Sequence, residues 1–110
     1  MGKFKLWRSS VNAQYYFRFN ASNGEQILSS EGYTTKQNCL NGIHAVKSRA
    51  PYDHAYERQD YPSNYRFVMR SANREIIARS SEGYTTRQGR ENAIEVVKRE
   101  APSAPIDDLT

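Results

Sequence analysis

One heptapeptide, Ser-Ser-Glu-Gly-Tyr-Thr-Thr, occurs twice in this chain, at Ser29–Thr35 and at Ser80–Thr86. When residues 29–51 are aligned with residues 80–102, 14 of 23 positions are identical. A chain of 110 residues has the length of one ordinary domain. The repetition therefore predicts one domain in which two units share a core. We place this single domain at residues 1–110, with repeat 1 at about 1–51, repeat 2 at about 52–102 and a tail at 103–110.

Alternating apolar and polar side chains predict three strands before each heptapeptide. In the first repeat these strands are Lys3–Arg8, Tyr15–Asn20 and Glu25–Leu28, and Asn23-Gly24 is a typical hairpin turn between the last two. In the second repeat the predicted strands are Tyr56–Gln59, residues 65–70 and Glu75–Arg79, with a turn at Asp60–Asn64 and with Arg74 in place of the turn glycine. Each repeat therefore begins as a three-stranded antiparallel meander.

A helix is predicted after each heptapeptide. Thr34 and Gln37 have the spacing of a capping box, and Thr85 and Gln88 repeat it. A single apolar stripe follows at helical spacing, and a proline ends each helix. The stripe residues are Cys39, Ile43, Val46 and Ala50 before Pro51, and Ile94, Val97 and Ala101 before Pro102. Because Gly42 disfavours a helix, we expect a neighbour to approach the backbone closely there.

Three further expectations concern the heptapeptides, the strand before the second heptapeptide, and the tail. Gly32 and Gly83 are predicted to adopt positive φ in a turn. The second repeat has one extra residue between Ile77 and Ser80, which predicts a β-bulge near Ala78–Arg79. The tail is either disordered or adds an edge strand at Ile106–Leu109, and the analogy between the repeats favours the strand.

This combination of features resembles the YegP-like family of small, mostly bacterial, uncharacterised proteins. The resemblance covers nearly the whole chain. It is carried by Tyr15–Phe19, Asn23-Gly24-Glu25, Ser30–Thr35 and Asn41–Lys47, and by Tyr65–Phe67, Asn73, Glu75, Ser81–Thr86 and Asn92–Lys98. It implies an α+β fold in which two β3-α repeats form one continuous antiparallel sheet with both helices packed on one face. It also implies that the strand after each helix, at Tyr56 and at Ile106, crosses to the other repeat. The family implies no known activity.

The composition excludes several classes of site. The single cysteine, Cys39, rules out an internal disulfide, and its place in the apolar stripe predicts a buried, inert thiol. The two histidines, His44 and His54, lack metal-ligand spacing, so no metal or cofactor is expected. The sequence has no predicted signal peptide or transmembrane segment, and we expect a cytoplasmic monomer.

Catalysis is not predicted. Glu31 and Glu82 are repeated carboxylates, but nothing in the sequence brings them together, and we expect them to accept hydrogen bonds from backbone N–H groups near the helix starts. The chain contains no phosphate-binding loop or nucleophile elbow. We therefore expect a non-enzymatic protein.

The net charge of +4 lies in the first half, since residues 1–51 carry +5 (seven basic, two acidic) and residues 52–110 carry −1 (nine basic, ten acidic). If the apolar residues of the strands face the helices, the opposite face interleaves aromatic and basic side chains. Its predicted binding residues are Lys5, Trp7, Tyr16, Arg18, Arg66 and Arg70.

Such a face is typical of proteins that bind single-stranded nucleic acid, in which rings stack on bases and cations follow phosphates. A merely solvated sheet face has the same composition. The alternative function is a protein–protein interaction or structural module, in which Trp7 and Tyr16 would be the main contacts.

Overall fold

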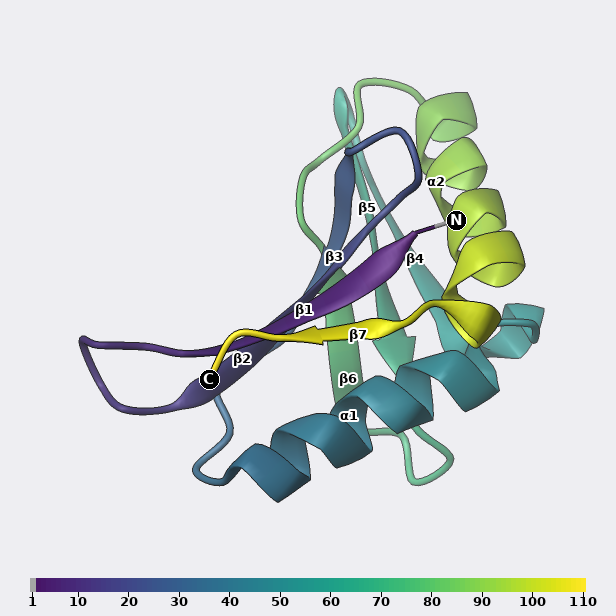
Figure 1. Ribbon diagram of the computed structural model, residues 1–110. Coiled ribbons are helices and arrows are strands. Elements are labelled where there is room, and N and C mark those ends of the chain that lie inside the picture. The colour runs from purple at the N-terminus through teal and green to yellow at the C-terminus, as the bar shows by residue number, and fades with distance from the viewer. Residues whose placement is uncertain (1) are drawn as a thin grey trace.

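The computed structural model describes residues 2–110, which form one seven-stranded sheet with both long helices on the same face (Figure 1). The strand order is β4-β5-β6-β3-β2-β1-β7. The first repeat contains β1 (Lys3–Arg8), β2 (Tyr15–Asn20), β3 (Gln26–Ser29) and α1 (Lys36–Arg49). The second contains β4 (Tyr56–Tyr61), β5 (Asn64–Arg70), β6 (Ile76–Ser80) and α2 (Arg87–Glu100), followed by β7 (Ile106–Asp108). The predicted α+β fold with two β3-α repeats is confirmed.

The strands that follow the helices lie at the two edges of the sheet, in the repeat opposite to their helix. β4 follows α1 and pairs with β5, whereas β7 follows α2 and pairs with β1. The expectation of a wholly antiparallel sheet is wrong at one edge, because β7 is parallel to β1, while every other pair is antiparallel. In the first repeat β1 already occupies the position beside the middle strand that β4 takes in the second. The tail therefore adds outside β1 and runs in the same direction.

The core lies between the sheet and the helices, as the alternation predicts. The side chains of Phe4, Leu6, Phe17 and Phe19 are fully buried on this face. The helix stripes meet them, and Cys39, Ile43, Val46, Ile94 and Val97 are also fully buried. None of the helices in residues 2–110 combines the length and apolar character that a membrane-spanning helix requires.

The helix caps lie one residue later than predicted. Thr35 accepts a hydrogen bond from the N–H of Asn38 at 3.1 Å, and Thr86 accepts one from Gly89 at 3.0 Å. The capping boxes based on Thr34 and Thr85 are therefore wrong. The glutamine of each predicted box donates instead to an asparagine four residues later on the helix, from Gln37 to Asn41 and from Gln88 to Asn92.

The glycines of the heptapeptides lie close to neighbouring side chains and do not adopt positive φ. The prediction of positive φ at Gly32 and Gly83 is wrong, because Gly24 is the only glycine of residues 2–110 with that conformation. A Cβ on Gly32 would lie 1.9 Å from Gln14 Oε1, and one on Gly83 would lie 1.7 Å from Asn64 Oδ1. At the hairpin turn of the second repeat Arg74 takes positive φ (71°), as Gly24 does (86°) in the first.

A β-bulge occurs in both repeats. The register shifts between Phe19 and Asn20 and again between Met69 and Arg70, which leaves Ile27 and Ile77 as the extra residues. The predicted bulge near Ala78–Arg79 is therefore misplaced, and the extra residue of the second repeat does not cause it.

The extra residue of the second repeat lies in the segment that connects β6 to α2. The hydroxyls of Ser30 and Ser80 are equivalent, since each accepts a hydrogen bond from the N–H of the phenylalanine in the middle strand. Tyr33 and Tyr84 are also equivalent, since Tyr33 forms a β-bridge with Tyr15 of β2 and Tyr84 forms one with Tyr65 of β5. The insertion thus falls between Ser80 and Tyr84, where a loop accommodates it.

A close approach at Gly42 is confirmed, and a side chain makes it. A Cβ at this position would lie 2.5 Å from Tyr33 Oη and 3.1 Å from Phe17 Cε2. We expect Gly42→Ala to destabilise the protein by about 1 kcal/mol, because the overpacking outweighs the gain in helix propensity. Urea unfolding measures this change. In the Tyr33→Phe background, which removes the nearest atom, the same substitution should be close to neutral, and an equal loss in both backgrounds would contradict the explanation.

Candidate binding face of the sheet

The sheet face opposite the helices carries a continuous row of residues, which the strand register defines. From β4 to β7 the row contains Glu57, Val68, Arg79, Ser29, Arg18, Lys5 and Asp107. The ends of the row are acidic and its centre is basic. Because neighbouring strands lie about 4.8 Å apart, the basic side chains of β6, β2 and β1 are within reach of one extended ligand.

Two aromatic rings lie beside this row. Trp7 and Tyr16 are cross-strand partners, and their rings stack with centroids 5.7 Å apart and planes inclined by 21°. The Arg18 guanidinium lies over the Trp7 ring at 4.5 Å, and the Asn12 amide donates to Tyr16 Oη at 2.8 Å. The structure therefore brings together Lys5, Trp7, Tyr16 and Arg18, with the rings already ordered.

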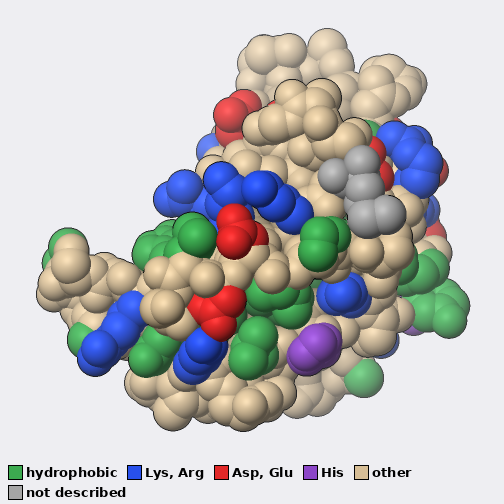
Figure 2. Space-filling model, viewed as in Figure 1, with side chains coloured by type: hydrophobic (Ala, Val, Ile, Leu, Met, Phe, Trp, Pro, Cys, Tyr) green, Lys and Arg blue, Asp and Glu red, His purple; other side chains and the backbone are tan. Residues whose placement is uncertain are grey.

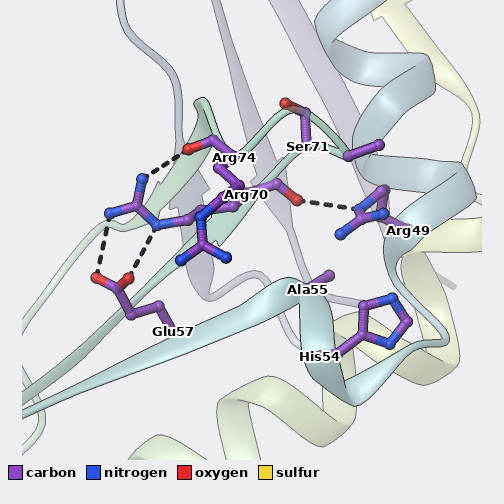
Figure 3. A pocket seen from close by; sticks show the side chains of 8 residues that line it. Arg49, His54, Ala55, Glu57, Arg70, Ser71 and Arg74 are labelled. Carbon is purple, nitrogen blue, oxygen red and sulfur yellow. Dashed lines mark hydrogen bonds and ion pairs between the residues drawn. The ribbon is translucent and has the colours of Figure 1, made fainter.

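Arg66 and Arg70 are separated from this group. Arg66 lies on β5, across the two central strands, and donates to Asn64 Oδ1 at 3.2 Å. Arg70 is directed to a different hollow, where its Nε donates to Glu57 at 2.9 Å and its Nη1 to the Arg74 carbonyl at 2.8 Å (Figure 3). This contact lowers the pKa of the Glu57 carboxyl and raises that of Arg70. Arg70 is thus satisfied within the protein and is a poor candidate for ligand binding.

Sequence reasoning missed Arg79, which lies at the centre of the row. Its Nη2 donates to Glu31 of the other repeat at 2.6 Å. Within residues 2–110 no backbone N–H donates to the carboxylate of Glu31 or Glu82, so the expectation that they accept such bonds near the helix starts is wrong. Alternation along the strand could not assign Arg79 to the open face, because the bulge at Ile77 interrupts the alternation.

Two hollows adjoin on this face. One, of about 400 Å³, is lined by Trp7, Tyr16, Arg18 and Ser29, among others. The second, of about 230 Å³, is lined by Ser29, Arg66, Val68 and Arg79, among others. Because Ser29 lines both, they form one shallow groove across the four central strands, bounded by the Trp7–Tyr16 stack and by Arg66.

Three basic side chains of the open face lack a carboxylate partner. Within residues 2–110, the side chains of Lys5, Arg18 and Arg66 have no carboxylate within 4.0 Å. Around β7, acidic side chains lie among the basic ones (Figure 2), and Lys36 pairs with Asp108 at 2.5 Å. The open face therefore presents basic side chains that no neighbouring carboxylate neutralises.

The other residues considered for chemistry do not form a common site. Because β3 and β6 are antiparallel, the heptapeptides with Glu31 and Glu82 leave this central pair at opposite ends. Cys39 is fully buried, and burial raises the pKa of its thiol to about 11. In the part of the chain that the structure describes, no three His, Cys, Asp or Glu side chains converge as a metal site requires.

A family model described as "Domain of unknown function (DUF1508)" matches the chain twice, over residues 10–57 and 63–108. The chain belongs to the DUF1508 family. The two matches correspond to the two repeats of the structure. The family description gives no activity, so the function of this DUF1508 chain must be argued from its own site.

Relatives and solved structures agree with this assignment. The UPF0339 protein YegP of Escherichia coli (strain K12) is 40% identical over 110 residues, which cover 99% of this chain and 98% of the relative. The solution NMR structure of UPF0339 protein SO3888 from Shewanella oneidensis has a TM-score of 0.90 at 35% identity, covering 99% of this chain and 92% of that one. The solution NMR structure of yegP from E. coli, a protein of unknown function, has a TM-score of 0.89 at 39% identity, covering 99% and 93%. This chain therefore has the same fold as these two solved structures.

Proposed function

We propose that this DUF1508 chain is a small non-enzymatic binding module whose open sheet face binds single-stranded nucleic acid weakly. The observation that carries the proposal is the groove in which unpaired basic side chains adjoin an ordered pair of aromatic rings. A flexible single strand can place a base against Trp7 or Tyr16 while its phosphates follow Lys5, Arg18 and Arg66. Each stacked base contributes roughly 1–3 kcal/mol, and phosphate contacts make the affinity dependent on salt.

Trp7 allows a direct test, because it is the only tryptophan of the chain and lies in the groove. Titration with an oligothymidylate of about eight nucleotides should quench its fluorescence at low salt, and the affinity should fall steeply as salt is added. Amide shifts should concentrate on β1, β2, β3, β5 and β6. Arg18→Ala should weaken binding about tenfold, since it removes a phosphate contact and a cation–π partner of the ring.

Arg87→Ala is the matched control. Arg87 is an equally basic, exposed residue on the helix side, where it contacts Asp60, and its loss should leave the affinity nearly unchanged. The proposal fails if millimolar oligonucleotide causes neither quenching nor shifts in the groove, or if the affinity is independent of salt.

The second candidate is a protein-interaction module, which the half-buried Trp7–Tyr16 pair and the exposed Arg18 favour because Trp, Tyr and Arg dominate interface energetics. This alternative predicts a partner that is retained after nuclease treatment and lost with Trp7→Ala. Trp7→Phe should retain part of the binding.

A further inference from the structure

Two equivalent clefts lie between the repeats, on the helix side of the sheet. The first, of about 590 Å³, lies between α1 and the β5–β6 hairpin, and the second, of about 360 Å³, lies between α2 and the β2–β3 hairpin. Each cleft is therefore built from the helix of one repeat and the hairpin of the other. Both volumes fall in the range of small-molecule sites, about 300–1,000 Å³.

The clefts share five identical lining residues. The first contains Tyr33, Asn41, Asn73, Glu75 and Ile77, and the second contains Tyr84, Asn92, Asn23, Glu25 and Ile27 at the equivalent positions. They differ in size, because Gly42 and Ala45 of the first cleft correspond to Ala93 and Val96 of the second. The first cleft is therefore the more open of the two.

Only part of this repeated set is used to hold the fold. Asn23 Oδ1 accepts a hydrogen bond from the Glu25 N–H at 2.9 Å, and Asn73 makes the corresponding turn contacts. The oxygens of Asn41 and Asn92 each accept a hydrogen bond from the preceding glutamine of their helix. Among residues 2–110, by contrast, the carboxylates of Glu25 and Glu75 make no ion pair, and no side-chain or backbone N–H donates to them.

Each cleft thus presents a carboxylate without a partner beside a tyrosine ring and an apolar floor. The floor of the first cleft comes from Gly42, Ala45 and Ile77. Close to the second cleft, burial and the charges of Glu25 and Glu82 raise the pKa of Tyr84 to about 12, which keeps its hydroxyl protonated as a hydrogen-bond donor and acceptor. A carboxylate next to an aromatic ring is the usual combination for binding an organic cation.

We propose that each cleft binds an ammonium group on a short apolar stem, with Glu75 or Glu25 pairing with the cation and the bulged isoleucine contacting the stem. The sites are on the opposite side of the sheet from the groove, so this binding is independent of the nucleic-acid proposal. The same chemistry is offered by a free alkylamine and by the side chain of lysine in a peptide. The first cleft, being larger, should bind more tightly.

Titration of the 15N-labelled protein with n-butylammonium, followed by NMR, tests the proposal. Shifts should appear at the Asn41 and Asn92 side-chain amides and around Ile77 and Ile27, whereas butyrate and n-butanol should cause neither set. Glu75→Gln should weaken binding in the first cleft about tenfold and leave the second unchanged, and Glu25→Gln should do the reverse. Each cleft thus serves as the control for the other.

A second arm uses Nα-acetyl-lysine N-methylamide in place of n-butylammonium. Tighter binding than the free amine assigns the clefts to lysine side chains, and weaker binding assigns them to free amines. The proposal is overturned if neither probe shifts the cleft residues at millimolar concentration, if butyrate or n-butanol shifts them equally, or if the two glutamine variants do not act selectively on their own clefts.

Discussion

Replacing Glu91 by Leu is expected to lower the free energy of unfolding by about 2 kcal/mol. The Glu91 carboxylate accepts hydrogen bonds from Arg58 Nε at 2.9 Å and from Arg90 Nε at 3.0 Å, and the Arg90 side chain is only 4% exposed. Removing one partner of a buried ion pair costs more than the pair contributes, because the remaining charge stays desolvated. Partial exposure of Glu91 and the remaining Arg90–Asp60 pair reduce the expected loss from the usual value of about 3–5 kcal/mol.

The double variant Arg90→Met/Glu91→Leu should recover most of this loss. The first repeat has Cys39 and Leu40 at the two equivalent positions, so the fold already tolerates an apolar pair there. Every charge that remains keeps a partner, since Asp60 retains Arg87 and Arg58 retains Asp53. Urea unfolding at neutral pH measures all three proteins. Glu95→Gln, on the exposed side of α2, is the control and should change the stability by less than about 0.5 kcal/mol.

Acid titration of the same proteins provides an independent check. Hydrogen bonds from Arg58 and then Lys98 lower the pKa of Asp53 to about 2, and hydrogen bonds from Arg58 lower that of Glu91. A carboxyl with a depressed folded-state pKa stabilises the protein above its unfolded pKa, near 4, and loses that contribution as the pH falls through the folded value. Stability should therefore fall between about pH 5 and pH 2, and the fall should be smaller in the double variant. An unchanged stability of the single variant, or identical acid profiles, would contradict the role of the network.

This network also shows where sequence reasoning reached its limit. The repeat alignment identifies Arg90 as the counterpart of Cys39, but not its partners. Asp60 was predicted to lie in a turn, whereas β4 continues to Tyr61 and the turn contracts to Pro62 and Ser63, the latter at positive φ (60°). Only the longer strand places Asp60 beside Arg90. The repeats, the core face and the crossing strands followed from periodicity and resemblance, because they depend on patterns that both repeats contain.

The candidate face could be predicted in part for the same reason. Strict alternation on β1 and β2 predicted Lys5, Trp7, Tyr16 and Arg18 correctly as a group. The ion pair that makes Arg70 a poor ligand-binding candidate could not be predicted, since it depends on the position of Glu57 across the hairpin. The clefts could not be predicted from the sequence, because each is formed by the helix of one repeat and the hairpin of the other.

Deleting residues 106–110 is expected to lower the free energy of unfolding by about 2–3 kcal/mol, because β7 pairs with β1 and covers its outer edge. The deletion removes the pairing of Ile106 with Phe4, the hydrogen bond from the Leu109 N–H to the Leu6 carbonyl at 2.8 Å, and the Lys36–Asp108 ion pair. Lost hydrogen bonds contribute about 1 kcal/mol each, and the loss of half-buried Ile106 adds an apolar term. Thermal or urea unfolding measures the difference.

The same deletion should make the protein associate in a manner that depends on salt. An uncovered strand edge can pair with a second chain, but Lys3 and Lys5 would repel their copies across such a contact. Association should therefore be weak at low ionic strength and increase as salt screens these charges, which sedimentation at two salt concentrations can detect. Asp108→Asn is the matched control, because it removes the exposed ion pair while keeping the strand, and it should change the stability by less than about 1 kcal/mol without causing association. If the truncated chain is as stable and as monomeric as the full chain at both salt concentrations, β7 does not protect this edge.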